Sequence, residues 1–235
     1  MSTGKVLRRV VGAMMVTAGA AGAYVRFLRP WLLRRGATDA EVERALPGDD
    51  LVQTPQWTAT QAITIHAAPD AIWPWIAQWG YGRGGFYSYD WIDRLIGAAG
   101  VVSSDRILPE HQQIHPGDFI PVAPNGGFVV SDVQPGRYLL LQNRLDLQTA
   151  QQIPPTTQLP EKYVDVTWAL VLEPEGAERT RLISRMRMDT RFTPSPAASL
   201  FMGELLKPGS AIMDYRMLQG IKCRAEGTCL QTNDA

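Results

Sequence analysis

Alternation of apolar and polar residues is the strongest pattern in the second half of the chain. Residues 162–173 and 179–191 both repeat with a period of two, which is typical of strands with one apolar face. The apolar positions are Val164, Val166, Trp168, Leu170 and Leu172 in the first run, and Leu182, Met186 and Met188 in the second. Opposite these lie Arg185 and Arg187, which we interpret as surface charges. The alternative is that their face lines a cavity and binds an anionic group.

Shorter patterns complete the expected order of elements. Further strands are predicted at 58–66, 118–122, 127–133 and 137–144, because these runs are rich in β-branched and aromatic residues between turn residues. Helices are predicted at 71–79, at 89–96 after the N-cap Ser88, and over the long tail 196–226, which Pro208 breaks or kinks. The order is one strand, two short helices, several antiparallel strands and a long C-terminal helix, so the fold class is α+β.

The N-terminus has a different pattern. Residues 10–25 contain no charge, and Lys5, Arg8 and Arg9 precede them. With the apolar residues that follow, residues 10–33 approach the length of about 20 residues that a bilayer span requires. We expect residues 1–36 to form a hydrophobic anchor helix with basic flanks. One alternative is a signal peptide cleaved near Ala23, and another is an amphipathic or buried helix of the folded domain.

The expected organisation is therefore an anchor at 1–36, a linker at 37–56, a domain at 57–227 and a flexible tail at 228–235. The linker is acidic and polar, and Thr38 with Glu41 forms a capping box for a short helix. The two cysteines, Cys223 and Cys229, are interpreted as free thiols. A bridge between them would require the chain to turn back at Gly227.

Charge and motifs exclude several classes of function. The chain has 235 residues with 23 basic and 23 acidic side chains, so no basic excess indicates nucleic-acid binding. In the stretch GYGRGGFYSYDW at 80–91, Gly80, Gly82 and Gly85 have the G-x-G-x-x-G spacing, but the stretch follows an expected helix rather than a strand and no Gly-Lys-Ser/Thr follows, which excludes a nucleotide loop. His111 and His115 are four residues apart, but the prolines around them leave room for at most one helical turn. We expect no metal and no cofactor.

The stretch 80–91 is instead typical of the rim of an apolar pocket. Its glycines allow close approach of the backbone, its aromatic residues supply large apolar surfaces, and Arg83 supplies donors for an oxygen-rich group. The alternative is that the aromatics pack the short helices on the sheet and that Arg83 pairs with Asp90 or Asp93. The candidate ligand-binding residues are Arg83, Phe86, Tyr87, Tyr89, Asp90, Trp91 and Trp168.

The wording of three stretches carries a family resemblance. APDAIWPWIAQWGYGRGGFYSYDWIDRL, DRILPEHQQIHPGD and MLQGIKCRAEG resemble the bacterial SRPBCC proteins of the START and Bet v 1-like superfamily, often labelled polyketide cyclase/dehydrase-like. The resemblance covers roughly residues 30–227. It implies a helix-grip fold, in which a curved antiparallel sheet wraps the C-terminal helix around a cavity. It implies no single activity, because one fold hosts many functions.

Two functions follow as expectations, and a structural partner-binding domain with a vestigial cavity is a third possibility. The first is a membrane-tethered module that binds a hydrophobic small molecule or lipid in its cavity. The second is an enzyme of the cyclase/dehydratase or hydrolase type, acting on a polyketide- or lipid-like substrate. The enzyme would need titratable residues that converge in the cavity, and the candidates are Tyr87, Tyr89, Asp90, Asp105, His111 and His115.

Overall fold

The computed structural model describes residues 19, 22–89, 91–92, 102–155, 157–192 and 207–229. Several expectations lie outside these residues. They concern most of the N-terminal apolar run, Asp90, most of the second short helix, the first part of the long C-terminal helix and the last six residues of the tail. Among the residues that the structure does describe, no helix combines the length and the apolar character needed to cross a membrane.

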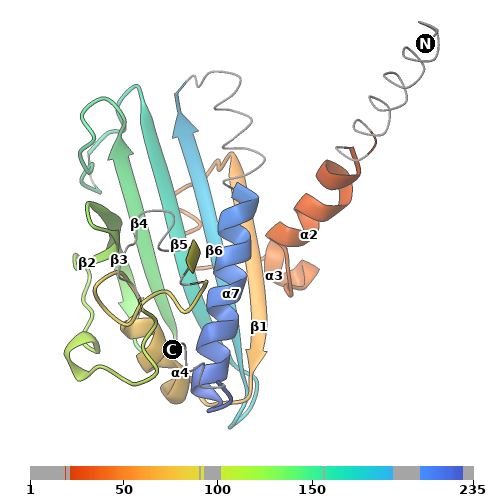
Figure 1. Ribbon diagram of the computed structural model, residues 1–235. Coiled ribbons are helices and arrows are strands. Elements are labelled where there is room, and N and C mark those ends of the chain that lie inside the picture. Colours follow the sequence, from red (N-terminus) through yellow and green to blue (C-terminus); the bar gives the residue numbers. More distant parts are fainter. Residues whose placement is uncertain are drawn as a thin grey trace, which may run out of the picture.

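A six-stranded antiparallel sheet forms the body of the protein (Figure 1). Its strands are β1 (Trp57–Ile65), β2 (Phe119–Ala123), β3 (Gly126–Gln134), β4 (Tyr138–Asp146), β5 (Tyr163–Pro174) and β6 (Thr180–Arg191). They lie in the order β1-β6-β5-β4-β3-β2, so the first strand pairs with the last. All six strands predicted from the sequence are present, because alternating apolar residues identify half-buried strands directly.

Two helices cover one face of the sheet, which we call the inner face (Figure 1). They are α4 (Pro69–Ala77) and the long helix α7 (Lys207–Ala225). Ile72 and Ile76 of α4 and Leu218 and Ile221 of α7 are completely buried against Leu170 and other inner-face residues. Burial of an aliphatic side chain stabilises a fold by about 1.5–3 kcal/mol, so these contacts fix both helices on the sheet. The α+β class is therefore confirmed.

The remaining helical segments are short. They are the π-helix η1 (Tyr24–Leu28), α2 (Arg29–Leu33), α3 (Asp39–Glu43) and the 3₁₀ turn η2 (Pro109–His111). Helix α3 begins at the predicted capping box, in which the Thr38 hydroxyl accepts from the amide of Glu41 and the Glu41 carboxylate accepts from the amide of Thr38.

The opposite, outer face of the sheet is covered by residues 36–53, which we call the covering segment. These residues were expected to be a linker, yet they pack on the sheet. Leu46 of the covering segment is buried in an apolar cluster with sheet residues of the outer face, namely Ala62, Leu140, Ala169, Val171 and Ile183. Gly48 lies so close to the sheet that a Cβ atom there would be 2.3 Å from a methyl group of Leu140. Both faces of the sheet therefore take part in a core.

Three arginines of β6 hold the covering segment in place. Arg185 is 3% exposed, and its guanidinium donates to the Asp49 carboxylate at 2.6 Å and to the carbonyls of Glu41, Val42 and Arg44. Arg187 donates to the carbonyl of Val52 at 2.9–3.0 Å. The expectation that Arg185 and Arg187 are surface charges is wrong, because the covering segment supplies carbonyl and carboxylate oxygens that replace water.

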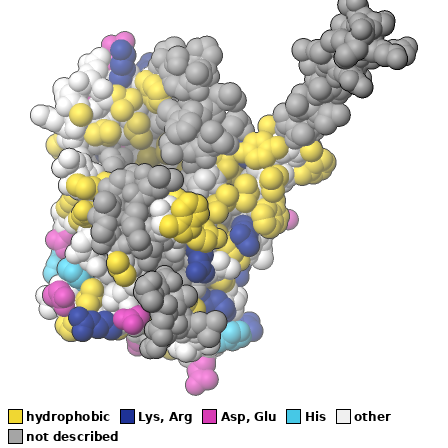
Figure 2. Space-filling model, in the orientation of Figure 1, with side chains coloured by type: hydrophobic (Ala, Val, Ile, Leu, Met, Phe, Trp, Pro, Cys, Tyr) yellow, Lys and Arg dark blue, Asp and Glu magenta, His cyan; other side chains and the backbone are white. Residues whose placement is uncertain are grey.

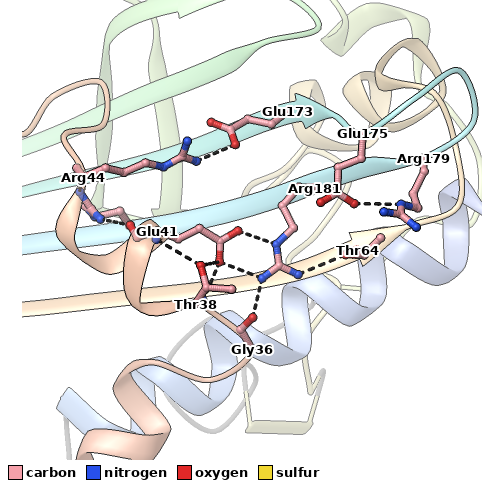
Figure 3. A network of polar contacts seen from close by, with 10 residues as sticks. Gly36, Thr38, Glu41, Arg44, Thr64, Glu173, Glu175, Arg179 and Arg181 are labelled. Carbon is pink, nitrogen blue, oxygen red and sulfur yellow. Dashed lines mark hydrogen bonds and ion pairs between the residues drawn. The ribbon is translucent and has the colours of Figure 1, made fainter.

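Arg181 makes the third contact of this set (Figure 3). Its guanidinium donates to both carboxylate oxygens of Glu41, at 2.7 and 2.9 Å, and to the carbonyl of Gly36. Burial alone would raise the pKa of Glu41, but hydrogen bonds from Arg181 and Thr38 outweigh burial and lower that pKa to about 2. We call Arg181, Arg185 and Arg187, with Glu41 and Asp49, the outer-face clamp.

A disulfide joins Cys223 and Cys229, so the expectation of two free thiols is wrong. Helix α7 ends at Ala225, and Gly227 adopts a positive φ of 65° that reverses the chain. The amides of Thr228 and Cys229 then donate to the carbonyl of Cys223, as in a glycine-terminated helix cap. This turn brings together two cysteines that a continuous helix would hold apart.

Loss of the buried arginine is expected to destabilise the protein strongly. Arg185→Ala removes the donor to one carboxylate and three carbonyls, and leaving buried polar groups without partners costs about 3–5 kcal/mol. Urea unfolding followed by circular dichroism measures this loss. Arg179→Ala is the matched control, because the Arg179 side chain is 54% exposed and forms a surface pair with Glu175, and its loss should cost less than about 1 kcal/mol. Equal losses for both variants would contradict the clamp.

Candidate functional site

The glycine-rich stretch 80–89 forms a closed loop between α4 and β2. Gly80 and Gly85 form a two-residue bridge, and the amide of Tyr81 donates to the carbonyl of Pro121 in β2 at 2.8 Å. Gly85 has a φ of 80°, and a Cβ atom there would lie 2.7 Å from the backbone of Ser103. Glycine is required at this position because the loop passes directly against another segment of backbone.

Arg83 closes this loop onto the end of α4. Its guanidinium donates to the carbonyl of Ala77, the last residue of α4, at 2.9 Å and to the carbonyl of His111 at 3.2 Å. Carbonyls at a helix end have no partner within the helix, so an arginine donor there is stabilising. Burial lowers the pKa of Arg83, and the nearby Asp118 carboxylate partly offsets this effect. These contacts give Arg83 a structural role.

Phe86 and Trp168 belong to an aromatic cluster on the inner face. The ring centroid of Trp79 lies 4.8 Å from that of Trp168 and 5.5 Å from that of Phe86. Phe128 of β3 extends the cluster, with its centroid 5.8 Å from that of Trp168. The structure therefore brings together two of the predicted residues, Phe86 and Trp168, through Trp79, which the sequence analysis did not select.

Tyr87 is 2% exposed and packs against the C-terminal half of α7. Its backbone touches Gly220, where a Cβ atom would lie 2.2 Å from the Tyr87 carbonyl oxygen. The Arg224 guanidinium lies 4.5 Å from the centre of the Tyr87 ring. Burial raises the pKa of Tyr87 to about 12. The phenol is therefore neutral at physiological pH.

Tyr89 and Trp91 point away from this cluster. Tyr89 is 37% exposed, with the Arg216 guanidinium 5.5 Å from its ring, and Trp91 is 65% exposed. Asp90 lies outside the described residues. Of the seven predicted ligand-binding residues, only Phe86, Tyr87 and Trp168 are thus described as buried in the inner-face core.

The most unusual polar group of the inner face is Asp214 of α7, which the sequence analysis missed. This aspartate is 8% exposed in an otherwise apolar layer. Its carboxylate accepts a hydrogen bond from the Ser184 hydroxyl at 3.0 Å, and Ser184 in turn accepts from the indole N–H of Trp168 at 2.8 Å. In the described part of the chain, Ser184 is the one hydrogen-bond partner of this carboxylate. Burial raises the pKa of Asp214 to about 7, and the Ser184 hydrogen bond opposes part of that shift.

The helical spacing of the sequence does indicate that Asp214 lies on the buried face of α7. Asp214 stands three and four residues before Met217 and Leu218, which are 2% and 0% exposed. Residues at this spacing share one helix face, so the pattern places a carboxylate on the buried side of α7. An ionisable residue at such a position is a candidate functional residue.

Half-buried apolar side chains lie next to this polar chain. Met186 of β6 is opposite Trp168 of β5 in the register, and Met188 is opposite Val166. Met186, Met188 and Phe128 all belong to the inner face, but unlike the core below them they keep partial exposure. Solvent therefore reaches this part of the inner face. We call Trp168, Ser184 and Asp214, with Phe128 and Met186, the inner-face site.

The other candidate acids and bases do not converge on this site. Asp105 is exposed, and His115 is 71% exposed and lies 3.7 Å from Asp118. Burial and the nearby Arg83 charge lower the pKa of His111, whose carbonyl binds Arg83. Tyr87 contacts α7 at Gly220, six residues or about 9 Å along the helix from Asp214. Within the described residues, no group of three or more His, Cys, Asp or Glu side chains could hold a metal.

A separate hollow of about 550 Å³ lies on the outer face, between the turn of the covering segment and the middle strands of the sheet. Its lining includes Leu51, Asp132, Tyr138 and Leu140. None of the predicted ligand-binding residues contributes to it. The hollow exists because the covering segment stands against the sheet at Gly48 and leaves the neighbouring surface uncovered.

Comparison with known proteins found similar solved structures only at low sequence identity. No family model matches the chain, and no curated protein matches its sequence. Similar solved structures include a hypothetical protein from Helicobacter pylori, with 9% identity, a TM-score of 0.44, and coverage of 77% of this chain and 95% of that chain. A conserved protein from Geobacillus kaustophilus has 11% identity, a TM-score of 0.40, and coverage of 73% and 97%. A protein from Mesorhizobium loti has 15% identity, a TM-score of 0.38, and coverage of 74% and 100%.

The buried carboxyl of Asp214 predicts a pH-dependent stability. Its pKa is about 7 in the folded protein and 3.8 as the reference value, so between these values the folded chain holds a proton that the unfolded chain releases. The free energy of unfolding therefore falls as pH rises from about 4 to about 7, by at most about 4 kcal/mol. Urea unfolding at pH 4.5, 6 and 7.5 measures the fall.

Asp214→Asn should remove this dependence, because an amide does not titrate. The stability of the variant relative to the natural protein should rise with pH up to about 7 and then stay constant. Asp105→Asn is the control, since it makes the same exchange at an exposed position. Parallel pH profiles for the natural protein and Asp214→Asn would show that the carboxyl is not held protonated.

A pair of glycines in α7 tests how the loop docks. Gly220→Ala places a methyl group 2.2 Å from the carbonyl of Tyr87, and such overpacking costs about 1–3 kcal/mol. Gly209→Ala meets nothing within 4 Å and should leave stability unchanged or raise it by up to about 1 kcal/mol. Thermal unfolding of the two variants measures the difference. Equal stability would mean that Tyr87 does not rest on α7.

Proposed function

We propose that this protein is a membrane-tethered SRPBCC-like module that binds a hydrophobic small molecule or lipid in the cavity of a helix-grip fold. The described antiparallel sheet with α7 on its inner face supports the fold part of the proposal. The ligand would lie against the inner-face site, with its apolar part on Phe128, Met186 and the Trp168 ring. This arrangement matches the general form of small-molecule sites, which are mostly apolar with few polar groups.

The observation that carries the proposal is the hydrogen-bond chain from Trp168 through Ser184 to Asp214 beside partly exposed apolar side chains. A buried carboxyl without a charged partner costs stability, so an apolar residue would serve the core better. Flexible methionine side chains at its border suit an apolar ligand of variable shape. A function for Asp214 explains why a polar group occupies this place.

The direction of the hydrogen bonds defines the polar end of the ligand. Trp168 donates to Ser184, and Ser184 donates to one oxygen of Asp214. Below a pH of about 7 the carboxyl is protonated and has one remaining donor, the acid O–H. This donor would bind an uncharged oxygen acceptor of the ligand, such as a carbonyl or hydroxyl. Among the described residues, no positively charged side chain contributes to the pKa of Asp214. The site therefore offers no cation to bind an anionic head group.

The membrane tether would be residues 10–33, and the alternative remains export after cleavage near Ala23. The basis is the charge-free run that precedes η1 and the basic residues on both of its sides. Catalysis is not part of the proposal. Among the described inner-face residues, Tyr87 and Asp214 have raised pKa values, and Tyr87 contacts α7 at Gly220, six residues from Asp214, so these two side chains do not form an acid–base pair.

A test of ligand binding uses the full chain purified from its host membranes. Native mass spectrometry should show a co-purifying hydrophobic mass that organic extraction removes. Met186→Trp would fill the inner-face site and should lower the affinity for the ligand by about tenfold or more. The reason is that the loss of a few apolar contacts with the ligand costs more than about 1.4 kcal/mol of binding free energy. Asp214→Leu should lower the affinity by a similar factor for a ligand with an oxygen acceptor, because that acceptor would lose its hydrogen bond.

The matched control is Val102→Trp, which adds the same side chain at a position that is 67% exposed. Its occupancy should equal that of the natural protein. Thermal unfolding of each variant separates loss of ligand from loss of fold. A natural protein without bound mass, or a bound mass that Met186→Trp leaves unchanged in a folded variant, would contradict the proposed site.

A further inference from the structure

Apolar side chains gather where the N-terminal helical segment leaves the domain (Figure 2). In η1 and α2, Val25 is 49% exposed, Phe27 is 68%, Leu28 is 48% and Trp31 is 54%. Together they expose more apolar surface than scattered single residues on a soluble surface would, and such a patch marks an interaction site. We call residues 22–35 the docking segment.

The N-terminal region is strongly basic, although the Arg34 guanidinium of the docking segment pairs with the Asp39 carboxylate just beyond it. Residues 1–38 contain seven lysines and arginines and no acidic residue, whereas the rest of the chain carries 16 basic and 23 acidic residues. Four of the seven basic residues belong to the docking segment, namely Arg26, Arg29, Arg34 and Arg35. The neutral overall charge of the protein therefore conceals a basic N-terminus on an acidic body.

The docking segment is attached firmly to the sheet and to α7. Leu32 is 8% exposed, and its carbonyl accepts from the Gln61 side chain of β1 at 2.7 Å. The Arg35 guanidinium lies 5.1 Å from the centre of the Trp31 ring and 4.1 Å from that of Tyr215 in α7. The carbonyl of Arg35 accepts from the amide of Ala62, and the carbonyl of Gly36 accepts from Arg181 of the outer-face clamp. The patch thus has a defined position on the domain.

We infer that the docking segment lies in the head-group layer of an anionic bilayer. Phe27, Leu28 and Trp31 enter the boundary of the acyl chains, and Arg26 faces lipid phosphates. Tryptophan and arginine both suit this interface, the first through its amphipathic ring and the second through a long stem with a charged head. The attraction between an anionic lipid surface and each nearby arginine contributes about 1 kcal/mol to the free energy of binding. The same surface repels the acidic body, which favours contact through the docking segment alone.

This inference rests on the membrane part of the proposed function, and it is independent of the ligand site. It also differs from the proposed span. Within the proposed tether of residues 10–33, the charge-free run 10–25 would lie in the hydrocarbon core whatever the lipid charge is, whereas the contact of the docking segment with the head groups depends on anionic lipid. The partner is therefore defined by its chemistry as a negatively charged lipid surface.

Spin labels on the full chain in liposomes test the inference. The two native cysteines form a disulfide, so Phe27→Cys or Trp31→Cys supplies a single thiol for a nitroxide. In liposomes with phosphatidylglycerol, both labels should be accessible to oxygen and protected from a water-soluble nickel chelate. Val102→Cys, at an exposed position of the body, is the control and should be accessible to nickel.

Charge dependence is the decisive part of this experiment. Arg26→Gln with Arg34→Gln removes two of the arginines and should reduce the ratio of docked to undocked label at position 27 about thirtyfold. Pure phosphatidylcholine liposomes should have the same effect. A label at Val16→Cys reports the span separately, so a water-exposed label there would contradict the tether and leave the docking inference to the labels at 27 and 31.

Two results would overturn the inference. The first is free access of nickel to the labels at 27 and 31 in anionic liposomes. The second is protection that persists in phosphatidylcholine and in detergent, together with spin–spin broadening, which would identify a second copy of the chain as the partner of the patch.

Discussion

The burial of the Arg185 guanidinium is the constraint on which the arrangement of the chain depends. A charge that is 3% exposed is tolerated only where oxygens replace its water, and the covering segment supplies the Asp49 carboxylate and three carbonyls. The segment in turn relies on these bonds and on the burial of Leu46 and Val52. Sheet and segment therefore fold as one unit, and the residues before position 57 belong to the structural core.

The inner face follows the opposite principle. There the core around α4 and the C-terminal half of α7 is mostly apolar, and the buried acid Asp214 has no cationic partner among the described residues. The two faces consequently respond to pH in opposite directions. Glu41 in the clamp has a lowered pKa, so its contribution is lost as pH falls below about 4.5, whereas the Asp214 carboxyl is most favourable when it is protonated.

The sequence predicted the elements better than it predicted their surroundings. Alternation located all six strands, and the pair Thr38 and Glu41 located α3, because these patterns depend on neighbours along the chain. A period of two does not reveal what covers the polar side of a strand. The pattern alone therefore predicts that the arginines of β6 are exposed to solvent. The disulfide depended on one glycine that reverses the chain. Asp214 was overlooked because a single acid hardly changes an apolar stripe.

The candidate site shows the same division. Aromatic residues after a glycine-rich loop were expected at a pocket, and Phe86 and Trp168 do lie in one cluster, joined by Trp79. Arg83 was selected for its chemistry, yet one of its terminal nitrogens donates to the carbonyls of Ala77 and His111 and ties the side chain to the loop. Which polar group faces the apolar surface is determined by contacts between β6 and α7, which are distant in the sequence. Local patterns cannot supply that information.

The two faces meet at neighbouring residues of the same elements. On β6, Ser184 binds Asp214 on the inner face while the next residue, Arg185, binds the covering segment on the outer face. On α7, Asp214 is followed by Tyr215, whose ring stacks against Arg35 of the docking segment. The N-terminal region therefore contacts both elements that position the Asp214 carboxyl. On β6 the contact is made by the residue after Ser184, and on α7 it is made by the residue after Asp214. A membrane that restricts the motion of the docking segment would also restrict the backbone around the inner-face site. The two proposed surfaces are therefore coupled through β6 and α7.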